Sequence, residues 1–522
     1  MTRSPHARWW AMGATALTLL VVGLDMTVLN VALPTIAVDL HASSSQLQWF
    51  VDAYTLVMSA MLLPAGMLGD RYGRKRLTLG ALTVFGAGSL WCAYAGSAAG
   101  LVAARAVLGL GSAILIPLAM SAAVVLFEPD ERPRAVMILG LSTMVGLPLG
   151  PILAGALLQH FWWGSVFLVN APVVVFALVA VAVCMPETRG ERDRPIDWVG
   201  VVASGLGLLG VTYGVIEGPE RGWTDPLTLV PLVGGAVVLV AFLVWERRQR
   251  RAVPVFDFAV WADPTFRWGA VGATVASLAM FGLMFVTPQY FRAVLGSDAL
   301  GTGLRTLPMV AGLLVGMRGT MLLTRRFRAR TLAATGFALT AIGLATGATT
   351  SVESGFARCA VWTALVGLGF GMALFASQNQ ALLTLPRQRA ASGSALIQAM
   401  RQGGSVLGIA VLGAVLNAAY RSQVGDLSVP DGARAAVADS PQTGITVAER
   451  LGDPGLIHGV RSAFVHGMDA TLWVSAVVAV VGAIAMWRLL PGDVPASASR
   501  EPAADAAESA HAVDATDSPA RV

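Results

Sequence analysis

Residues 66–76 read GMLGDRYGRKR, and they join two apolar runs that lie near residues 46–67 and 77–96. The glycines of this stretch permit a close approach of helices and a tight turn. The carboxylate of Asp70 is suited to face a helix N-terminus or an arginine. Basic residues clustered in a short loop are typical of the cytoplasmic side of a membrane protein; here they are Arg71, Arg74, Lys75 and Arg76. The stretch therefore predicts a short cytoplasmic turn between two membrane-spanning helices.

The composition of the whole chain also fits a lipid environment. Of its 522 residues, 55% are hydrophobic and 13% are charged, whereas a soluble domain has about 25% charged residues. One membrane span needs roughly 20 apolar residues. The prediction is an all-α polytopic membrane protein with fourteen transmembrane helices, near residues 10–33, 46–67, 77–96, 100–124, 134–158, 164–185, 196–216, 226–245, 267–291, 302–322, 331–349, 357–381, 395–417 and 468–490.

Basic residues alternate between the predicted loops. The first three loops on one side, near 34–45, 97–99 and 159–163, contain no Lys or Arg. This asymmetry predicts a multi-pass protein of the cell (inner or plasma) membrane with both termini in the cytoplasm. The loops on the cytoplasmic side all contain arginine and lie near 70–76, 128–134, 187–195, 246–251, 325–330 and 386–389.

An internal repeat divides the chain. Residues 71–80 read RYGRKRLTLG and residues 326–336 read RFRARTLAATG, and each opens a new apolar run. The equal orientation suggests two parallel six-helix bundles, with two inserted helices between them. We expect the bundles at 1–190 and 261–490, the inserted helices at 191–260, a long outer loop at 418–467, and a disordered cytoplasmic tail at 491–522.

Three charged residues, Asp25, Asp52 and Arg105, lie inside apolar runs. A charge at the centre of the bilayer costs roughly 2.5–3.5 kcal/mol or more, so it is expected to be paired or to face a cavity. From the predicted helix ends, the three lie roughly 12, 9 and 8 Å below the outer boundary, so they can meet at one level. They form either a structural ion pair or part of an ion or substrate path, and we favour the path.

Four stretches resemble one family. Residues 24–34 read LDMTVLNVALP, residues 105–111 read RAVLGLG, and residues 146–155 read GLPLGPILAG. With residues 66–76, they are similar to motifs of the major facilitator superfamily, in its fourteen-helix drug:proton antiporter branch. Two positions depart from the family pattern: Leu108 stands where Gln is common, and Ala154-Gly155 where Gly-Gly is common.

The resemblance implies roles for these motifs. It implies proton coupling by Asp25 and Arg105. Asp52 is a further candidate because of its depth, and it would either share the proton or contact a cationic substrate. Asp70 and the glycine spacing favour a cytoplasmic gate latch formed by Gly66, Asp70, Arg71, Gly73 and Arg74, with membrane topology alone as the alternative. The resemblance implies that the partner of this latch is the start of the helix near Ser392. The antiporter motif contains Gly146, Gly150, Pro151 and Gly155. We expect it to pack against the tenth helix through Gly312, Gly316 and Gly319, with ordinary membrane packing as the alternative.

Substrate contacts are expected where the two bundles meet. Aromatic, Met and amide side chains suit varied flat apolar ligands, although packing or lipid-facing roles are the alternative for each residue. The candidates are Asn30, the ninth-helix residues Met280, Phe281, Met284, Phe285, Gln289 and Tyr290, and the twelfth-helix residues Phe375, Gln378, Asn379 and Gln380. Three further arginines in apolar runs, Arg305, Arg318 and Arg401, receive no assigned role.

The sequence contains no motif of an enzyme. We find no Walker loop, nucleophile elbow or HExxH motif, so we expect no catalytic residue, metal, cofactor or ATP. Cys92, Cys184 and Cys359 lack the spacing of a metal site and are interpreted as packing residues. The net charge of +5 fits membrane orientation rather than nucleic-acid binding.

The expected function is that of a proton-coupled antiporter, a monomer in the lipid bilayer, that exports small amphipathic organic compounds such as drugs, antibiotics or dyes by alternating access. The alternatives are a dedicated exporter of one natural product, amino acid or siderophore and, more remotely, a non-transporting membrane sensor or enzyme.

The predicted topology has a direct test. Cysteine tags placed in the C-terminal tail and in residues 418–467 should react differently with a membrane-impermeant thiol reagent added to intact cells. The tag in 418–467 should be labelled and the tail tag should not. Equal labelling of both tags from outside would contradict the topology.

Overall fold

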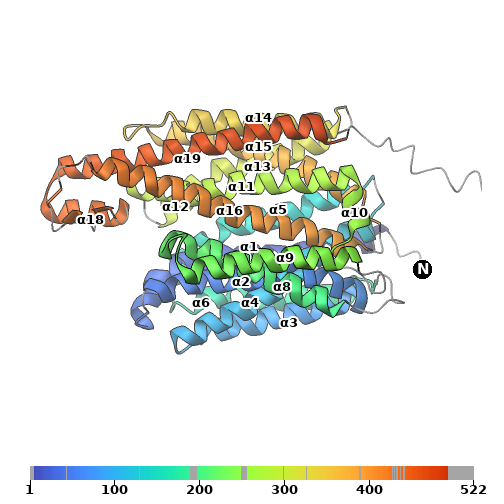
Figure 1. The fold of residues 1–522 in the computed structure, drawn as a ribbon. Helices are drawn as coiled ribbons and strands as arrows, with labels where there is room; N and C mark the ends of the chain where they lie inside the picture. The colour runs from blue at the N-terminus through green and yellow to red at the C-terminus, as the bar shows by residue number, and fades with distance from the viewer. Residues whose placement is uncertain are drawn as a thin grey trace, which may run out of the picture.

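Helices form all the regular secondary structure of the described chain. The structure is a computed structural model, and long helices lie side by side in it with their axes nearly aligned (Figure 1). The predicted tail lies outside the described residues, apart from residue 491. The description covers residues 5–491 except 43, 129, 189–196, 249–254, 298, 325, 387–388, 426, 428, 431–432, 435–436 and 439–440.

The first six predicted runs correspond to the N-terminal helices. The sixth run is divided at Val169 into a short helix and a longer one. The helices are α1 (Pro5–Asp39), α2 (Ser44–Tyr72), α3 (Arg74–Ala93), α4 (Ala98–Leu126), α5 (Arg132–Leu158), α6 (Ser165–Leu168) and α7 (Asn170–Cys184).

The remaining runs correspond to the middle and C-terminal helices. The middle pair is α8 (Trp198–Arg221) and α9 (Pro226–Arg248). The tenth run is divided between two helices, α12 and α13. The C-terminal helices are α10 (Phe258–Ala262), α11 (Pro264–Ala293), α12 (Ala299–Arg305), α13 (Leu307–Leu323), α14 (Ala329–Gly347), α15 (Phe356–Leu383), α16 (Ala390–Gly425), α18 (Pro441–Leu451) and α19 (Pro454–Leu489).

The two halves of the chain repeat one packing pattern. In the N-terminal half α1 packs on α5 and α7, α4 packs on α2 and α3, and α3 packs on α7. In the C-terminal half α11 packs on α16 and α19, α15 packs on α13 and α14, and α14 packs on α19. Each helix thus has the neighbours of its counterpart in the other half, as the repeated sequence suggests.

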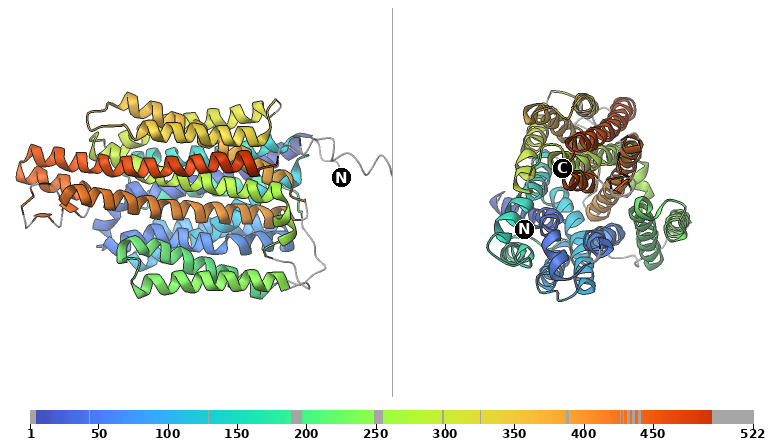
Figure 2. Two further views of the ribbon diagram at one scale, coloured as in Figure 1. Left: turned by 45° about the horizontal axis from the view of Figure 1, so that its top comes forward. Right: turned by 90° about the vertical axis from the view of Figure 1, so that its left-hand side faces the viewer.

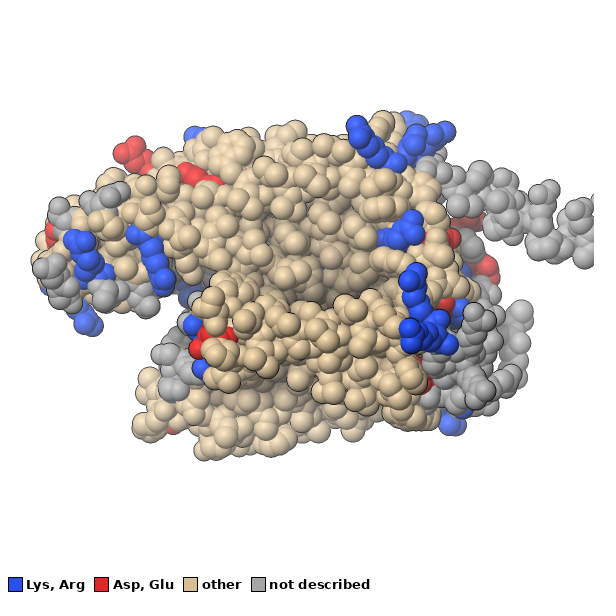
Figure 3. Space-filling model, in the orientation of Figure 1, with Lys and Arg blue, Asp and Glu red and all other residues tan. Residues whose placement is uncertain are grey.

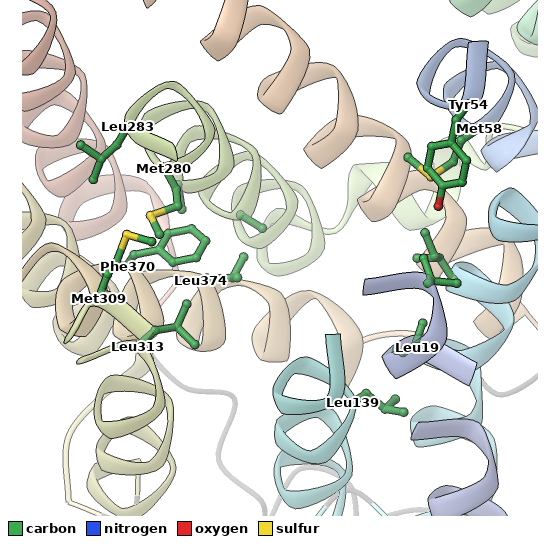
Figure 4. Close-up of a cluster of buried hydrophobic side chains, with 14 of the residues drawn as sticks. Leu19, Tyr54, Met58, Leu139, Met280, Leu283, Met309, Leu313, Phe370 and Leu374 are labelled. Carbon is green, nitrogen blue, oxygen red and sulfur yellow. The ribbon is translucent and has the colours of Figure 1, made fainter. Parts of the chain in front are cut away.

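The halves meet through equivalent helices. Helix α2 of the first half packs on α16 of the second, and α5 packs on α12 and α13. The pair α8 and α9 lies outside the two halves, where α8 contacts α2 and α16 (Figure 2, right). The labelled buried side chains of Figure 4 likewise form two groups, with Leu19, Tyr54 and Leu139 in one and Met280, Met309 and Phe370 in the other.

The surface has the distribution of charge that a membrane requires. Toward the viewer in Figure 3, Lys, Arg, Asp and Glu gather near the two ends of the helices, and a broad belt of other residues lies between them. Within the described residues, ten helices are long and apolar enough to cross a membrane. Helices α3, α5, α11 and α14 are not among the ten, so the count of fourteen spans stays a prediction.

The segment 418–467 is more helical than its prediction as a loop suggested. Helix α16 continues to Gly425, α18 occupies Pro441–Leu451, and α19 already begins at Pro454. In Figure 1 these parts extend beyond the other helices, at the end away from the start of α1. Tyr420 of α16 connects this helix to the segment that precedes α18, because its hydroxyl donates a 2.8 Å hydrogen bond to the carbonyl of Val437.

The glycines of α5 have neighbours on two helices. A Cβ added at Gly146 would lie 2.7 Å from the carbonyl oxygen of Leu20, and one at Gly150 would lie 3.0 Å from that of Leu24. Both neighbours belong to α1. A Cβ at Gly155 or Gly319 would meet nothing within 4 Å, while Gly312 and Gly316 lie against the α15 residues Ala364 and Leu368. Gly146, Gly150, Gly312 and Gly316 therefore serve contacts inside each half, while a Cβ at Gly140 of α5 would lie 2.6 Å from Cε of Met317 on α13. The side chain of Pro151 lies outside the described part.

This packing predicts a difference between two glycines of α5. Gly146→Ala should lower the melting temperature of the purified protein, because its methyl group meets backbone atoms of α1; overpacking typically costs about 1–3 kcal/mol. Gly155→Ala is the control, and it should leave the melting temperature unchanged or raise it slightly because alanine favours helix. Equal melting temperatures for both variants would contradict the contact between α1 and α5.

Candidate functional site

A buried ion pair joins α1 and α4. Nη1 of Arg105 donates a 2.7 Å hydrogen bond to Oδ2 of Asp25. The side chains are 2% and 0% exposed, respectively, so the pair is shielded from solvent on all sides. Removing one partner of such a pair typically costs 3–5 kcal/mol, because the other charge stays buried and uncompensated.

Neutral groups complete the surroundings of the pair. Nε of Arg105 donates to the carbonyl of Phe50 at 2.8 Å, and its guanidinium lies 4.5 Å from the centre of the Tyr54 ring. Nδ2 of Asn170 donates to Oδ1 of Asp25 at 3.3 Å. The pair is therefore held by α1, α2, α4 and α7 together.

The sequence indicated only part of this network. Asp25 and Arg105 meet, as their predicted depths suggest. Asp52 is partly buried on α2. Asn170 was missed, although an amide at the break between α6 and α7 was a visible signal in an otherwise apolar run. Ser89 lies beside it, since Nδ2 of Asn170 is 3.1 Å from the Ser89 hydroxyl oxygen.

Asp70 connects the two halves at the end where α2 stops. Its Oδ2 accepts a 2.9 Å hydrogen bond from the backbone N–H of Ser392, and its Oδ1 accepts one of 3.3 Å from Ala391. These N–H groups belong to the first turn of α16, where they have no partner within the helix and where the helix dipole favours an anion. Arg74 also donates to Asp70 Oδ1, at 2.5 Å.

Glycines bring the segments of this contact together. A Cβ added at Gly66 would lie 2.3 Å from Cβ of Ala395, so only glycine allows α2 and α16 to approach this closely. Gly73 has a φ of 109°, a conformation that suits glycine. Arg71 is partly exposed beside them. We call Asp70, Arg74 and the first turn of α16 the latch.

A cavity of about 100 Å³ lies between the halves. Both halves line it, through α1, α2, α4 and α5 on one side and α13, α15 and α16 on the other. Ligand pockets are typically 300–1,000 Å³, so the cavity must widen to hold a drug-sized compound. Its lining is Leu19, Val22, Met26, Leu62, Ile116, Met120, Val136, Gly140, Thr143, Met317, Leu374, Phe375, Gln378, Gln398, Arg401, Gln402 and Ser405.

Two of the residues proposed from the sequence, Phe375 and Gln378 of α15, line this cavity, whereas the described candidates Met284, Gln289, Tyr290 and Asn379 are not in its lining. Tyr290 is buried, and its hydroxyl lies 3.3 Å from the carbonyl of Ser351. Asn379 is also buried, while Met284 and Gln289 are partly exposed. The side chains of Asn30, Phe281 and Phe285 lie outside the described part. Sequence reasoning thus found part of the α15 side of the cavity, while no described side chain of α11 is in the lining.

The three unassigned arginines have different environments. Arg305 donates to the carbonyl of Leu295 at 3.4 Å and lies over the Phe356 ring. Arg318 is exposed on α13, so it is not the buried charge that its apolar run suggested. Arg401 lines the cavity. Among the described residues, no group of three His, Cys, Asp or Glu side chains is arranged to hold a metal ion.

Solved structures with this arrangement of helices are membrane transporters. The chain is similar to the proton:xylose symporter XylE with a TM-score of 0.60 and 13% identity, over 94% of this chain and 97% of that one. At this identity the likeness shows the fold alone. The fold is that of a polytopic transporter, built from two repeated halves with a cavity between them.

Sequence comparison places the chain within a family. It belongs to the Major Facilitator Superfamily, whose family model matches residues 15–409. It is 32% identical over 502 residues to the multidrug efflux pump LfrA of Mycolicibacterium smegmatis, covering 92% of this chain and 96% of the relative. It is 30% identical to the tetracenomycin C resistance and export protein of Streptomyces glaucescens, covering 91% and 90%. The family and these relatives indicate a transporter, not an enzyme.

The latch geometry predicts the effect of one neutral substitution. Asp70→Asn should reduce transport severalfold while leaving the amount of protein in the membrane nearly normal, because an amide keeps the shape but loses the charge that faces α16 and Arg74. Transport of a fluorescent dye in vesicles measures the effect. The control is Asp130→Asn, an exposed acid, which should transport normally. Normal transport by Asp70→Asn would reduce Asp70 to a residue that only shapes the turn.

Proposed function

We propose that this transporter is a proton-coupled antiporter that exports small organic compounds from the cell by alternating access. The observation that carries the proposal is the buried pair of Asp25 and Arg105, whose carboxylate and guanidinium lie 2.7 Å apart inside the helical bundle. Ionisable groups at such positions usually mark ion or substrate paths. Both termini are placed in the cytoplasm in this proposal, because of the arginine-rich loops.

The pair supplies a means of loading and releasing a proton. While Arg105 contacts Asp25, the opposite charge favours the ionised carboxylate. When a movement of the helices separates them, the apolar surroundings favour the neutral acid, and Asp25 takes a proton from the outer side. Return of Arg105 after the conformational change releases that proton toward the cytoplasm. Asn170 can hold either form, since its amide donates to the carboxylate and its carbonyl can accept from the acid.

Alternating access requires contacts between the halves that open and close. The latch supplies such a contact at one end, because Asp70 belongs to the first half and Ala391 and Ser392 belong to the second. The same end carries a hydrogen bond of 3.4 Å from Arg132 to the carbonyl of Leu383. Opening the cytoplasmic side must break these bonds, and closing it re-forms them. The packing of α1 on α5 keeps the first half rigid during this movement.

A dedicated exporter of one natural product is the second candidate. The observation in its favour is the similarity to the tetracenomycin C resistance and export protein, which spans nearly the whole chain. The similarity to the multidrug efflux pump LfrA supports broad export over a similar length. Both candidates share the coupling mechanism, so the choice between them depends on the cavity.

Proton coupling is tested with purified protein in proteoliposomes. Asp25→Asn should abolish proton movement driven by a dye that the wild type exports, and should stop uphill efflux while some dye binding remains. Arg105→Ala should also uncouple transport, because the acid left alone in an apolar site stays protonated. Full proton-coupled efflux by Asp25→Asn would refute the assignment. The same assay on Asp52→Asn would then show whether that residue is the carrier.

A further inference from the structure

The cavity between the halves has one charged residue in its lining. All the other lining residues in the described chain are apolar or carry neutral polar groups, and none is Asp or Glu. The charged residue is Arg401 of α16. It is partly exposed, and its guanidinium borders the cavity. The electrostatic character of the substrate site is therefore set by a single positive charge.

Neutral groups hold this guanidinium in place. Nε lies 3.2 Å from the hydroxyl of Ser277, and Nη1 donates to Oε1 of Gln378 at 3.1 Å and to Oε1 of Gln398 at 2.8 Å. Three donors of the guanidinium are thus oriented by α11, α15 and α16. Nη2 donates to no described residue, so this edge of the fork remains available to a ligand.

Arg401 differs from Arg105 in its lack of a counter-charge. Arg105 meets the carboxylate of Asp25 at 2.7 Å, whereas no described carboxylate forms an ion pair with Arg401. Amide and hydroxyl oxygens satisfy N–H donors but do not neutralise the charge. Arg401 therefore presents a positive charge to the cavity, and its hydrogen-bond partners among the described residues are neutral.

We propose that the cavity binds organic anions, with Arg401 pairing with a carboxylate or another acidic group of the substrate. This inference rests on the proposed export function and specifies the substrate class. The free Nη2 can donate charge-assisted hydrogen bonds to a carboxylate, which are stronger than those between neutral groups. Gln402 and Ser405 of the same helix add polar groups beside it.

The rest of the lining defines the other part of the substrate. Met26, Met120, Met317 and Phe375 provide flexible and aromatic apolar surface, which adapts to rings of different shape. The expected substrate is an amphipathic compound with an aromatic or alicyclic body and one acidic group. A cation of the same shape would place its charge near Arg401, and the repulsion would weaken its binding.

The membrane potential favours export of such an anion. Moving one elementary charge across 100 mV is worth about 2.3 kcal/mol. In a cell with a negative interior, an anion that leaves and a proton that enters both move with the electrical force. The membrane potential therefore drives both the exit of the anion and the entry of the proton. In the exchange of a proton for a cation, it would not favour both movements.

The experiment compares two probes with one ring system and opposite charge. Anthracene carboxylate and anthracenylmethylammonium are tested by equilibrium dialysis against the purified full-length protein. The wild type should bind the carboxylate at least roughly tenfold more tightly than the ammonium compound. Arg401→Gln should weaken carboxylate binding roughly tenfold or more, as expected for the loss of charge-assisted hydrogen bonds, and should leave or improve binding of the ammonium compound. Arg401→Lys should lie between them, since it keeps the charge without the fork.

Two controls separate this effect from misfolding. Arg318→Gln removes an exposed arginine of α13 and should bind both probes as the wild type does. The wild-type preference for the carboxylate is independent of any variant. Equal or tighter binding of the ammonium compound by the wild type overturns the proposal, and so does unchanged carboxylate binding by a folded Arg401→Gln protein.

Failure of this inference differs from failure of the proposed function. If the ammonium compound is bound more tightly and exported with proton exchange, the anion assignment is wrong and the antiporter stands. If Arg401→Gln loses carboxylate binding while Asp25→Asn retains full proton-coupled export, the anion site stands and the coupling assignment fails. The binding assay and the proton assay thus test separate residues in separate halves.

Discussion

The cost of placing charge inside a membrane governs how this protein is built. Asp25 and Arg105 offset this cost by pairing with each other. Asp70 offsets it through Arg74 and the backbone N–H groups at the start of α16. Each solution ties together helices that are distant in the sequence. The positions of α1, α2, α4 and α7 follow from the first pair, and the contact of α2 with α16 follows from the second. The described hydrogen-bond partners of Arg401 are all neutral oxygens, unlike those of Asp25 and Asp70.

The repeated packing explains why these charges can move relative to one another. Within each half, glycines bring the helices to backbone contact, as Gly146 does between α5 and α1 and Gly312 does between α13 and α15. Between the halves, such a close approach occurs where Gly66 of α2 meets α16 beside the latch, and elsewhere hydrogen bonds and a small cavity lie at the boundary. Helix pairs at backbone contact resist rearrangement, because interiors are closely packed. A change of shape therefore falls on the boundary between the halves rather than within either one.

The sequence predicted the features that follow from the cost of burying a charge and those that belong to a family motif. The meeting of Asp25 with Arg105 followed from their depths, and the contact of Asp70 near Ser392 followed from family resemblance. The glycines of α5 show a limit of prediction from the sequence, because their spacing reveals a face of small residues but not which helix packs against that face. The cavity lining shows another, because an aromatic and Met-rich face is equally suited to lipid, core and cavity. Arg401 was visible as a charge in an apolar run, but its lack of a counter-charge depends on three helices that only the fold brings together.

One helix has a mechanical consequence. The first turn of α16 contacts Asp70 through Ala391 and Ser392, and Arg401 lies nine residues further along the same uninterrupted helix. At a rise of 1.5 Å per residue, the two positions are roughly 14 Å apart along the axis. A continuous helix behaves as a rod over this distance, so tilting it at the cavity displaces its end at the latch. A force on the Arg401 guanidinium is therefore transmitted along α16 to the carboxylate of Asp70. The stiffness of α16 determines how closely movement at the cavity is coupled to movement at the latch.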